Sequence, residues 1–517
     1  MDYVEVFLIS LLAIGASYAR MALALLFSVL FSFAIGIAAG TNKSFEKVAI
    51  PVLDILQSIP ILGFFPVAIQ LFYTAVPVIG AELAAIFLIF TSQTWNITFA
   101  VYESTRFIRS ELLDTARFLR INLLDRLRYL YIPTCLPRVV RNFQPSWANG
   151  MFFLVGSEIL TFGETEIQLF GLGTIVSRFA VEGNVTGIAT VLILLVFTTV
   201  LINLLVFIPL NNLFEAPFRK PSRRWEKFGF LRKIAKAPKP HLPIPVMTFF
   251  EYNRAVGEIV KRLTIPSSLL RNLAFFILAG LGVALLATGG DEFFERIYET
   301  LQRLGFETIA LSSFYSFVRV MAAVGFSVAW SLPAAIAIAR KPDLSATVAT
   351  VFQVIASIPV TIVYPLLAES LANMPELRAF IMIIAATQWY VFFQVLAGLR
   401  NIPQVELEVV DLLQLKTWDR VKLVYLPRSA PALITGCITA AGGAWNGLVV
   451  AERLVLGDVV AETDLPGLGK LLSQLTYAGD LLGSIAVIIV MSGIIVLMNR
   501  LFWKRLYDTT ASKLKIM

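Results

Sequence analysis

Long apolar runs recur along the whole chain, and this pattern restricts the fold more than any other feature of the sequence. A run of about 20 apolar residues crosses the hydrocarbon core of a bilayer as one helix. The chain is 57% hydrophobic and only 15% charged, which is more apolar surface than a water-soluble fold buries. The sequence therefore predicts an all-α polytopic membrane protein. About eleven transmembrane helices are expected, near residues 18–40, 48–73, 80–101, 143–163, 187–213, 268–288, 308–339, 345–371, 378–398, 432–456 and 480–503.

One strongly polar stretch, EAPFRKPSRRWEKFGFLRKIAKAPKPHLPIP, divides the chain near its middle. Basic stretches beside membrane spans face the cytoplasm. Such a stretch can also bind nucleic acid or anionic lipid, but a topology-fixing linker is the favoured interpretation, with no nucleic-acid partner. The expected domains are a first transmembrane domain at 1–214, a cytoplasmic linker at 215–267 and a second transmembrane domain at 268–517. The acidic start MDYVEVFLIS has no basic n-region, so no removable signal peptide is expected.

The two halves of the chain repeat each other. QSIPILGFFP at 57–66 returns as ASIPVTIVYP at 356–365. Further pairs follow in the same order: Arg20 and Arg319, Ser28 and Ser327, Trp95 and Trp389, DRLRYLYIPTCLP at 125–137 and DRVKLVYLPRSAP at 419–431, Glu158 and Glu452, and GLG at 171–173 and 467–469. Matches spread over a whole half in one order indicate internal duplication.

The expected topology makes the two repeats parallel. Each repeat contains an odd number of expected spans, and the additional span at 268–288 returns the chain across the membrane between them. Acidic stretches at 289–302 and 457–464 then fall on the side opposite the basic linker, as the distribution of basic residues in membrane proteins requires. Parallel repeats are related by a pseudo-two-fold axis along the membrane normal.

A charged helical segment interrupts the apolar runs in each half, at 114–133 and at 408–427. A polar segment that occurs twice on the cytoplasmic side is expected to dock a partner with two-fold symmetry. The segment resembles the coupling motif of ABC importer permeases, in which Glu-Ala-Ala is followed by Gly and then by a hydrophobic residue and Pro. The matching residues are Asp114, Ala116 and Pro133 in the first half, and Glu408 and Pro427 in the second.

Both copies depart from that motif at its glycine, which is replaced by Arg120 and Gln414. The break between two short helices is therefore expected to form differently, with Asn122 as a candidate N-cap in the first copy. The remaining charges are expected to face the partner or to satisfy the positive-inside rule. They are Asp125, Arg126, Arg128, Asp419, Arg420 and Lys422.

The stretch GGAWNGLVVAE at 442–452, followed by LPGLGKLL, resembles permeases of the nitrate, sulfonate and taurine type. The duplicated arrangement resembles the fused permease component of ABC anion transporters. The resemblance implies the type I, MetI-like fold in the cell (inner) membrane, and ATP-driven import of a small anion such as nitrate, a sulfonate, taurine or bicarbonate. It also implies a dimer of ATPase subunits, a substrate-binding protein and membrane lipid as partners, with one permease chain per transporter. A fused iron(III) or molybdate permease is the alternative within this class.

The chain lacks the pattern of a nucleotide site. A phosphate-binding loop has Gly, four residues and then Gly-Lys-Ser/Thr, but Lys470 is followed by Leu471, and Asp464 stands where the first glycine belongs. We therefore expect no enzymatic activity and no cofactor on this chain, with ATP and Mg²⁺ held by the partner ATPase. A single His241 and two cysteines make a metal site and a disulfide unexpected.

Polar residues and helix-breaking prolines inside the spans are the candidates for the translocation pathway, because a polar group in lipid is costly. They are Gln57, Pro60, Glu158, Pro359, Trp445, Asn446 and Glu452. For the two glutamates a polar clamp between helices is the alternative. The expected external gate comprises Gly171, Gly173, Gly467 and Gly469, where backbone N–H groups at a helix start can meet an anion or the glycines can form a simple turn or hinge.

Two other classes remain open at this stage. A secondary transporter driven by an ion gradient also has internal repeats and polar breaks, but it needs no pair of charged cytoplasmic segments. A membrane-bound enzyme is disfavoured, because a chain with one histidine offers no Ser/His/Asp set.

Overall fold

The computed structural model describes residues 3–61, 79–162, 165–215, 290–339, 360–456 and 459–516, together with a few isolated positions between these ranges. The elements of the first half are α1 (Tyr3–Thr41), α2 (Lys43–Ser58), α4 (Gly80–Arg106), α5 (Ser110–Phe118), α6 (Leu123–Arg126), η3 (Leu127–Tyr131), α7 (Ile132–Glu158), β1 (Ile159–Phe162), β2 (Thr165–Gln168), α8 (Leu172–Val181), α9 (Val185–Ile202), η4 (Asn203–Phe207) and α10 (Ile208–Glu215). Those of the second half are α14 (Gly290–Leu304), α15 (Phe306–Ala339), η7 (Val360–Ile362), α17 (Tyr364–Ser370), α18 (Pro375–Arg400), α19 (Gln404–Leu412), α20 (Thr417–Arg420), η8 (Val421–Tyr425), α21 (Leu426–Glu452), β3 (Arg453–Leu456), β4 (Val459–Glu462), α22 (Leu468–Tyr477), α23 (Leu481–Met498), η9 (Asn499–Trp503) and α24 (Lys504–Ile516).

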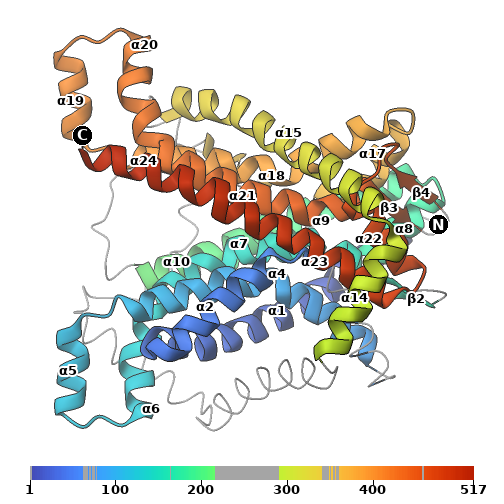
Figure 1. The fold of residues 1–517 in the computed structure, drawn as a ribbon, viewed down its shortest axis with the longest axis horizontal. Helices are drawn as coiled ribbons and strands as arrows, with labels where there is room; N and C mark the ends of the chain where they lie inside the picture. The colour runs from blue at the N-terminus through green and yellow to red at the C-terminus, as the bar shows by residue number, and fades with distance from the viewer. Residues whose placement is uncertain are drawn as a thin grey trace.

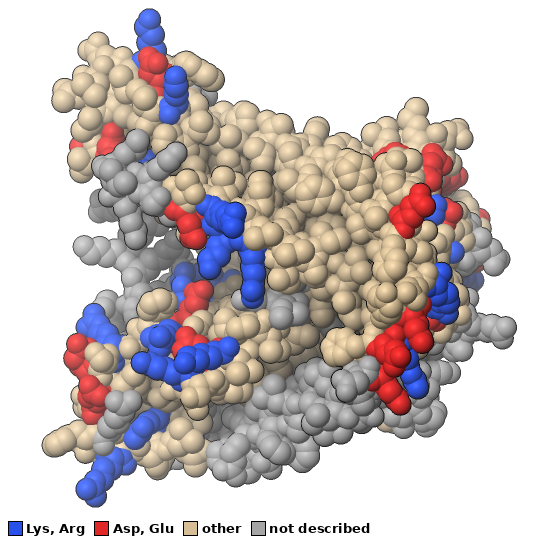
Figure 2. Space-filling model, viewed as in Figure 1, with Lys and Arg blue, Asp and Glu red and all other residues tan. Residues whose placement is uncertain are grey.

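The described helices have the lengths and apolar surfaces of membrane spans. Seven of them are long and apolar enough to cross a bilayer. Figure 2 shows a broad band without charged side chains between two charged ends, which is how a protein with a lipid-facing belt is arranged. The expected all-α polytopic membrane fold is confirmed. The expected span at 268–288 lies outside the described residues, and those at 48–73 and 345–371 are described only in part.

Three long helices form the centre of each half, and they pack in the same order in both halves. In the first half α4 packs between α1 and α7, and in the second half α18 packs between α15 and α21. Small residues permit the close approach of α1 to α4. A Cβ atom added at Gly36 would lie 2.8 Å from the side chain of Val101, and one added at Gly40 would lie 2.7 Å from Thr105. A Gly-x-x-x-Gly spacing of this kind brings helix backbones together in membranes.

The two repeats run in the same direction, as expected for parallel repeats. Helices α5–α6 and α19–α20 project from one end of the molecule, well apart from each other, and we call them the two tips (Figure 1). The strand pairs β1–β2 and β3–β4 lie at the opposite end, which we call the hairpin end (Figure 1). The acidic helix α14 also lies toward the hairpin end, so its charges are on the side opposite the tips.

Short β-hairpins replace the ends of two expected spans. We expected membrane helices over 143–163 and 432–456, but α7 ends at Glu158 and α21 ends at Glu452. The next four residues in each half form a strand that pairs antiparallel with β2 or β4. The turn back is closed by hydrogen bonds from Leu169 N to Glu158 O and from Thr463 N to Glu452 O, each 2.9 Å. These bonds pair carbonyl groups that the helix ends leave open.

The halves contact each other through buried apolar side chains. Phe152 of α7 packs against the core of the second half, which includes Trp445 and Tyr364. Leu366 of α17 packs in return against the core of the first half. The interface therefore lies beside α7, α17 and α21.

Candidate functional site

A buried arginine joins four elements at the hairpin end of the first half. Arg20 of α1 donates through Nε and Nη2 to the two carboxylate oxygens of Glu82 on α4, at 2.6 and 2.7 Å. Its Nη1 donates to Glu158 Oε1 on α7 at 2.8 Å. Ser17 donates to the same oxygen at 2.5 Å, and Gly173 N at the start of α8 donates to Glu158 Oε2 at 2.7 Å. We call these residues the first clamp.

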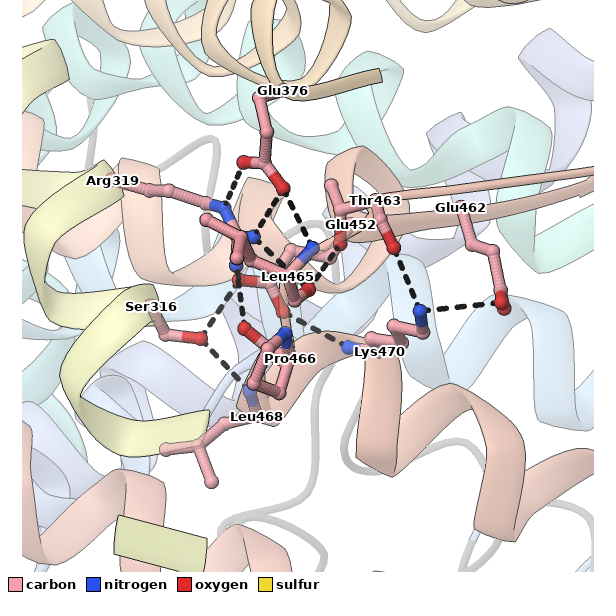
Figure 3. Close-up of polar contacts among 10 residues, drawn as sticks. All are labelled: Ser316, Arg319, Glu376, Glu452, Glu462, Thr463, Leu465, Pro466, Leu468 and Lys470. Carbon is pink, nitrogen blue, oxygen red and sulfur yellow. Dashed lines mark hydrogen bonds and ion pairs between the residues drawn. The ribbon is translucent and has the colours of Figure 1, made fainter. Parts of the chain in front are cut away.

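The second half contains the same arrangement, which Figure 3 shows in close-up. Arg319 of α15 donates to both oxygens of Glu376 on α18, at 2.9 and 2.8 Å, and to Glu452 Oε1 on α21 at 2.7 Å. Ser316 donates to Glu452 Oε1 at 2.7 Å, and Lys470 N on α22 donates to Glu452 Oε2 at 3.0 Å. We call this set the second clamp. Glu158 and Glu452, which we call the inner glutamates, have fully buried side chains. Glu82 and Glu376 are the outer glutamates.

The Gly-Leu-Gly triplets are shaped by these clamps. The start of α8 and the start of α22 each point backbone N–H groups at a buried carboxylate, which is the favoured place for a negative charge on a helix. A Cβ atom at Gly171 or Gly467 would overlap the carboxylate of Glu158 or Glu452. The anion that these N–H groups meet is therefore a glutamate of the chain itself. Whether Gly171, Gly173, Gly467 and Gly469 form an external gate stays a prediction.

The sequence predicted Glu158 and Glu452 as candidates for the translocation pathway, but the two side chains lie in the clamps. Neither Glu158 nor Glu452 borders the large cavity between the two halves, which we call the central cavity. The alternative of a polar clamp between helices describes their contacts. The outer glutamates, Glu82 and Glu376, were missed by the sequence analysis. Arg20 and Arg319 supplied a signal, because an arginine inside a membrane span needs a carboxylate partner nearby.

A cavity of about 840 Å³ lies between the two halves. Among the expected pathway residues, Gln57 and Asn446 line it, as do Trp95 and Trp389. Other polar side chains on its wall include Asn96, Arg141, Gln144, Asn149, Asn211, Gln394, Arg400 and Asn499, with hydroxyl groups from Ser92, Tyr390 and Thr439. The wall thus combines amide groups with two guanidinium groups, which is a surface of hydrogen-bond donors and positive charge.

Two hydrogen bonds cross from one half to the other at this cavity. Ile61 N, next to the Pro60 break, donates to Asn446 Oδ1 at 2.7 Å, and Tyr390 donates to Asn149 Oδ1 at 2.9 Å. Both bonds therefore join the two halves beside this cavity.

The remaining pathway candidates lie elsewhere. Trp445 is fully buried in the core of the second half and Pro60 is also buried, and neither lines the cavity. Pro359 lies outside the described residues. The described part of the chain contains no group of three His, Cys, Asp or Glu side chains placed to bind a metal ion.

The tips keep the helix break of the coupling motif without its glycine. Arg120 has φ 49° and Gln414 has φ 48°, so both adopt the left-handed conformation that usually favours glycine. The chain then closes each turn by a hydrogen bond from Ile121 N to Ala116 O at 3.0 Å, or from Leu415 N to Val410 O at 3.4 Å. The break between the two short helices is thus made without glycine, and the expected N-cap at Asn122 is present in the first copy.

Arginines at equivalent positions of the two charged segments brace these turns. Arg126 Nε donates to Ile121 O and Arg420 Nε donates to Leu415 O, both at 2.8 Å. Arg420 also forms an ion pair of 2.6 Å with Asp411. In the first copy Asn122 caps α6 by accepting from Asp125 N at 2.8 Å. These contacts shape the tips from within. The cap at Asn122 was expected from the sequence, whereas the contacts of Arg126 and Arg420 within the tips were not.

The other residues of the charged segments lie on the helices of the tips or at the start of α7 and α21. Asp114 and Ala116 lie on α5, and Glu408 lies on α19. Asp419 lies on α20, Lys422 is exposed on η8, and Pro133 and Pro427 are the second residues of α7 and α21. Large apolar side chains are exposed around them, namely Phe118, Leu119, Leu123, Leu412, Leu413, Trp418 and Leu423.

Breaking a clamp is expected to destabilise the whole half that it joins. Arg319→Met leaves the fully buried carboxylate of Glu452 without its cation, and removing one partner of a buried ion pair costs about 3–5 kcal/mol. Arg178→Met is the matched control, because its ion pair with Glu182 is exposed and such pairs contribute about 0–1 kcal/mol. Thermal unfolding of the two purified variants in one detergent checks this. Equal shifts of the midpoint would contradict the role given to the clamp.

The turn at Gln414 is expected to tolerate glycine and to reject a β-branched residue. Gln414→Gly keeps the left-handed backbone, whereas Gln414→Val opposes it, because β-branched residues rarely adopt positive φ. Hydrogen exchange at the amide of Leu415, which closes the turn, reports the change directly. We expect faster exchange in the valine variant only. Unchanged protection in that variant would show that the turn does not depend on residue 414.

Comparison with known proteins agrees with the duplicated architecture. Two segments, residues 32–215 and 327–503, match the family described as binding-protein-dependent transport system inner membrane component. The chain is also similar to the nitrate import permease protein NrtB of Leptolyngbya laminosa, with 30% identity over 107 residues. That match covers 21% of this chain and 38% of the relative's length. The chain belongs to the family of inner-membrane components of binding-protein-dependent transport systems and carries two copies of its domain in one polypeptide.

Proposed function

We propose that this chain is the complete pair of permease domains of an ATP-driven importer for a small anion, with ATP hydrolysed by a partner. The observation that carries the proposal is the presence of two equivalent tips at one end of the molecule (Figure 1). An ATPase dimer has two-fold symmetry, so a permease with two parallel tips can dock both of its subunits at once.

The surface of the tips supports docking to a protein. Phe118 is 87% exposed, its counterpart Leu412 is 82% exposed, and Trp418 is 72% exposed. Clustered apolar side chains on an exposed element are typical of protein interfaces, and aromatic residues contribute much of the binding energy in such contacts. We infer that these side chains enter a groove on each ATPase subunit, while Arg126 and Arg420 keep the tips rigid.

The clamps and the tips together suggest how motion is transmitted. The first clamp joins α1, α4 and α7 to one another at the hairpin end. The second clamp joins α15, α18 and α21 in the same way. A half held in this way moves as one body, so that approach of the two tips when the ATPase closes rocks one half against the other. The cavity between the halves and the bonds that cross it are then the parts that change.

The nature of the cavity wall supports an anion as the substrate. Arg141 and Arg400 bring positive charge to it, and Gln57, Gln144 and Gln394 bring amide groups. Planar guanidinium groups are well suited to bind oxyanions. The similar relative is named a nitrate import permease, so nitrate is the first substrate to test. A separate binding protein would deliver it, as the name of the family indicates.

Removal of the apolar tip is expected to uncouple the transporter. The double variant Leu412→Ser, Trp418→Ser should bind the ATPase more weakly, because truncating a buried interface anchor costs about 2 kcal/mol or more, roughly a thirtyfold loss of affinity. Phe294→Ser is the control, since Phe294 is 71% exposed on α14 at the other end. ATPase affinity and uptake of labelled nitrate in proteoliposomes measure the effect. Equal affinity and uptake in both variants would refute docking through the tips.

The assembled transporter is expected to contain one copy of this chain and two copies of the ATPase. Each ATPase subunit needs one tip, and this chain supplies both tips (Figure 1). Native mass spectrometry of the complex released from lipid gives the ratio directly. Two permease chains for two ATPase subunits would mean that one tip in each chain is not used for docking.

A further inference from the structure

A second, smaller cavity of about 130 Å³ lies between the halves at the hairpin end. It is bordered by the end of α7, by the end of α21 with strand β3, by α22, and by Thr361 and Tyr364. Its lining is mostly apolar, and the polar side chains that border it come from the second half of the chain. A cavity of about 10–15 Å³ by this measure holds one water molecule, so this one is large enough for an anion of several heavy atoms.

Arg453 brings a guanidinium group to this cavity. Its Nη1 donates to Ser473 at 3.4 Å, and its guanidinium carbon lies 5.0 Å from the centre of the Tyr477 ring. Its Nε lies 3.3 Å from Glu462, but this atom makes no hydrogen bond to any described residue. Glu462 is shared with Lys470 at 3.2 Å. Arg453 thus shares Glu462 with Lys470, which also lies close enough to Glu376 of the second clamp to act on its charge.

A second polar group at this cavity lacks a partner. Thr361 is 6% exposed, and its hydroxyl makes no hydrogen bond within the described part of the chain. A buried hydroxyl without a partner is costly, so such a group commonly marks a place where a ligand or water binds. A hydroxyl donor and a guanidinium group around one cavity suit an oxyanion.

Most of these polar residues have no polar counterpart in the first half, although Ser177 stands at the place of Ser473. In the register of the repeats, Ile159 stands at the place of Arg453, Ala180 at the place of Thr476 and Val181 at the place of Tyr477. The clamps, by contrast, are present in both halves. Arg453 is therefore not part of the architecture that the two repeats share.

The small cavity adjoins the central one. Phe152 and Phe153 of α7 line both cavities, and their rings lie 4.7 Å apart, edge to face. The ring centres of Phe152 and of Tyr364 on the other half lie 6.4 Å apart. These aromatic side chains separate the two spaces, so that a solute in the small cavity has to displace them to reach the larger one.

We propose that the small cavity is a binding site through which the transported anion passes before it enters the central cavity, with Arg453 as the residue that binds it and Phe152 as the barrier behind it. The inference rests on the proposed anion import. The expected ligand is an oxyanion of the size of nitrate or of a small sulfonate. Its negative charge is held by the guanidinium group, and the Thr361 hydroxyl donates to one of its oxygens.

The test uses the charge of thiol reagents on the full chain in lipid nanodiscs. In a background with Cys135→Ala and Cys437→Ala, Ser473→Cys places one thiol on the cavity wall. We measure the rate at which this thiol reacts with a sulfonate-bearing thiosulfonate and with a trimethylammonium-bearing thiosulfonate. Each rate is divided by the rate of a neutral thiosulfonate, which corrects for changes in access. The expected preference for the sulfonate reagent is about tenfold, equivalent to 1.4 kcal/mol. Added nitrate should slow that reaction.

The preference should disappear with Arg453→Gln and remain with Arg453→Lys and with the control Arg178→Gln. A preference that survives Arg453→Gln, a faster reaction with the cationic reagent, or a thiol that no reagent reaches would overturn the proposal. The outcome for the proposed function is separate. If the reconstituted transporter imports no nitrate or sulfonate while the preference depends on Arg453, the anion site stands and the proposed substrate class falls.

Discussion

The ion pairs of Arg20 and Arg319 are the interactions on which the rest of the structure depends. A guanidinium group inside a membrane span is stable only if carboxylates surround it, and each arginine binds one glutamate from each of two neighbouring helices. The inner glutamates then accept from backbone N–H groups of the next helix. One charge centre in each half thus fixes the relative positions of four elements that are far apart in the sequence.

The clamps lie at one end of the molecule and the tips at the other, and this separation has a mechanical consequence. A body fixed at its hairpin end transmits a displacement of its tip along α7 or α21, because Pro133 and Pro427 join each tip directly to these long helices. Glu406 and Arg428 add a two-bond ion pair, at 2.8 and 2.7 Å, between α19 and α21. Rigid tips on rigid halves are what a rocking mechanism requires.

The two halves differ in residue type at several positions that line the cavities between them. Asn446 corresponds to Phe152, Tyr390 to Asn96, and Arg453 to Ile159. The repeats share the clamps that join the helices of each half, and they differ in side chains that line the two cavities.

The sequence by itself determined the membrane fold, the duplication and the positions of the tips, because apolar length and repeated charged segments are local properties of the chain. It also pointed to Glu158, Glu452 and the Gly-Leu-Gly triplets, since polar residues in lipid stand out. Only the tertiary structure decided that these residues bind one another, because their partners Arg20 and Arg319 lie 138 and 133 positions away. The same holds for the turns at Arg120 and Gln414, where packing and braces from Arg126 and Arg420 impose a backbone conformation that residue type alone disfavours.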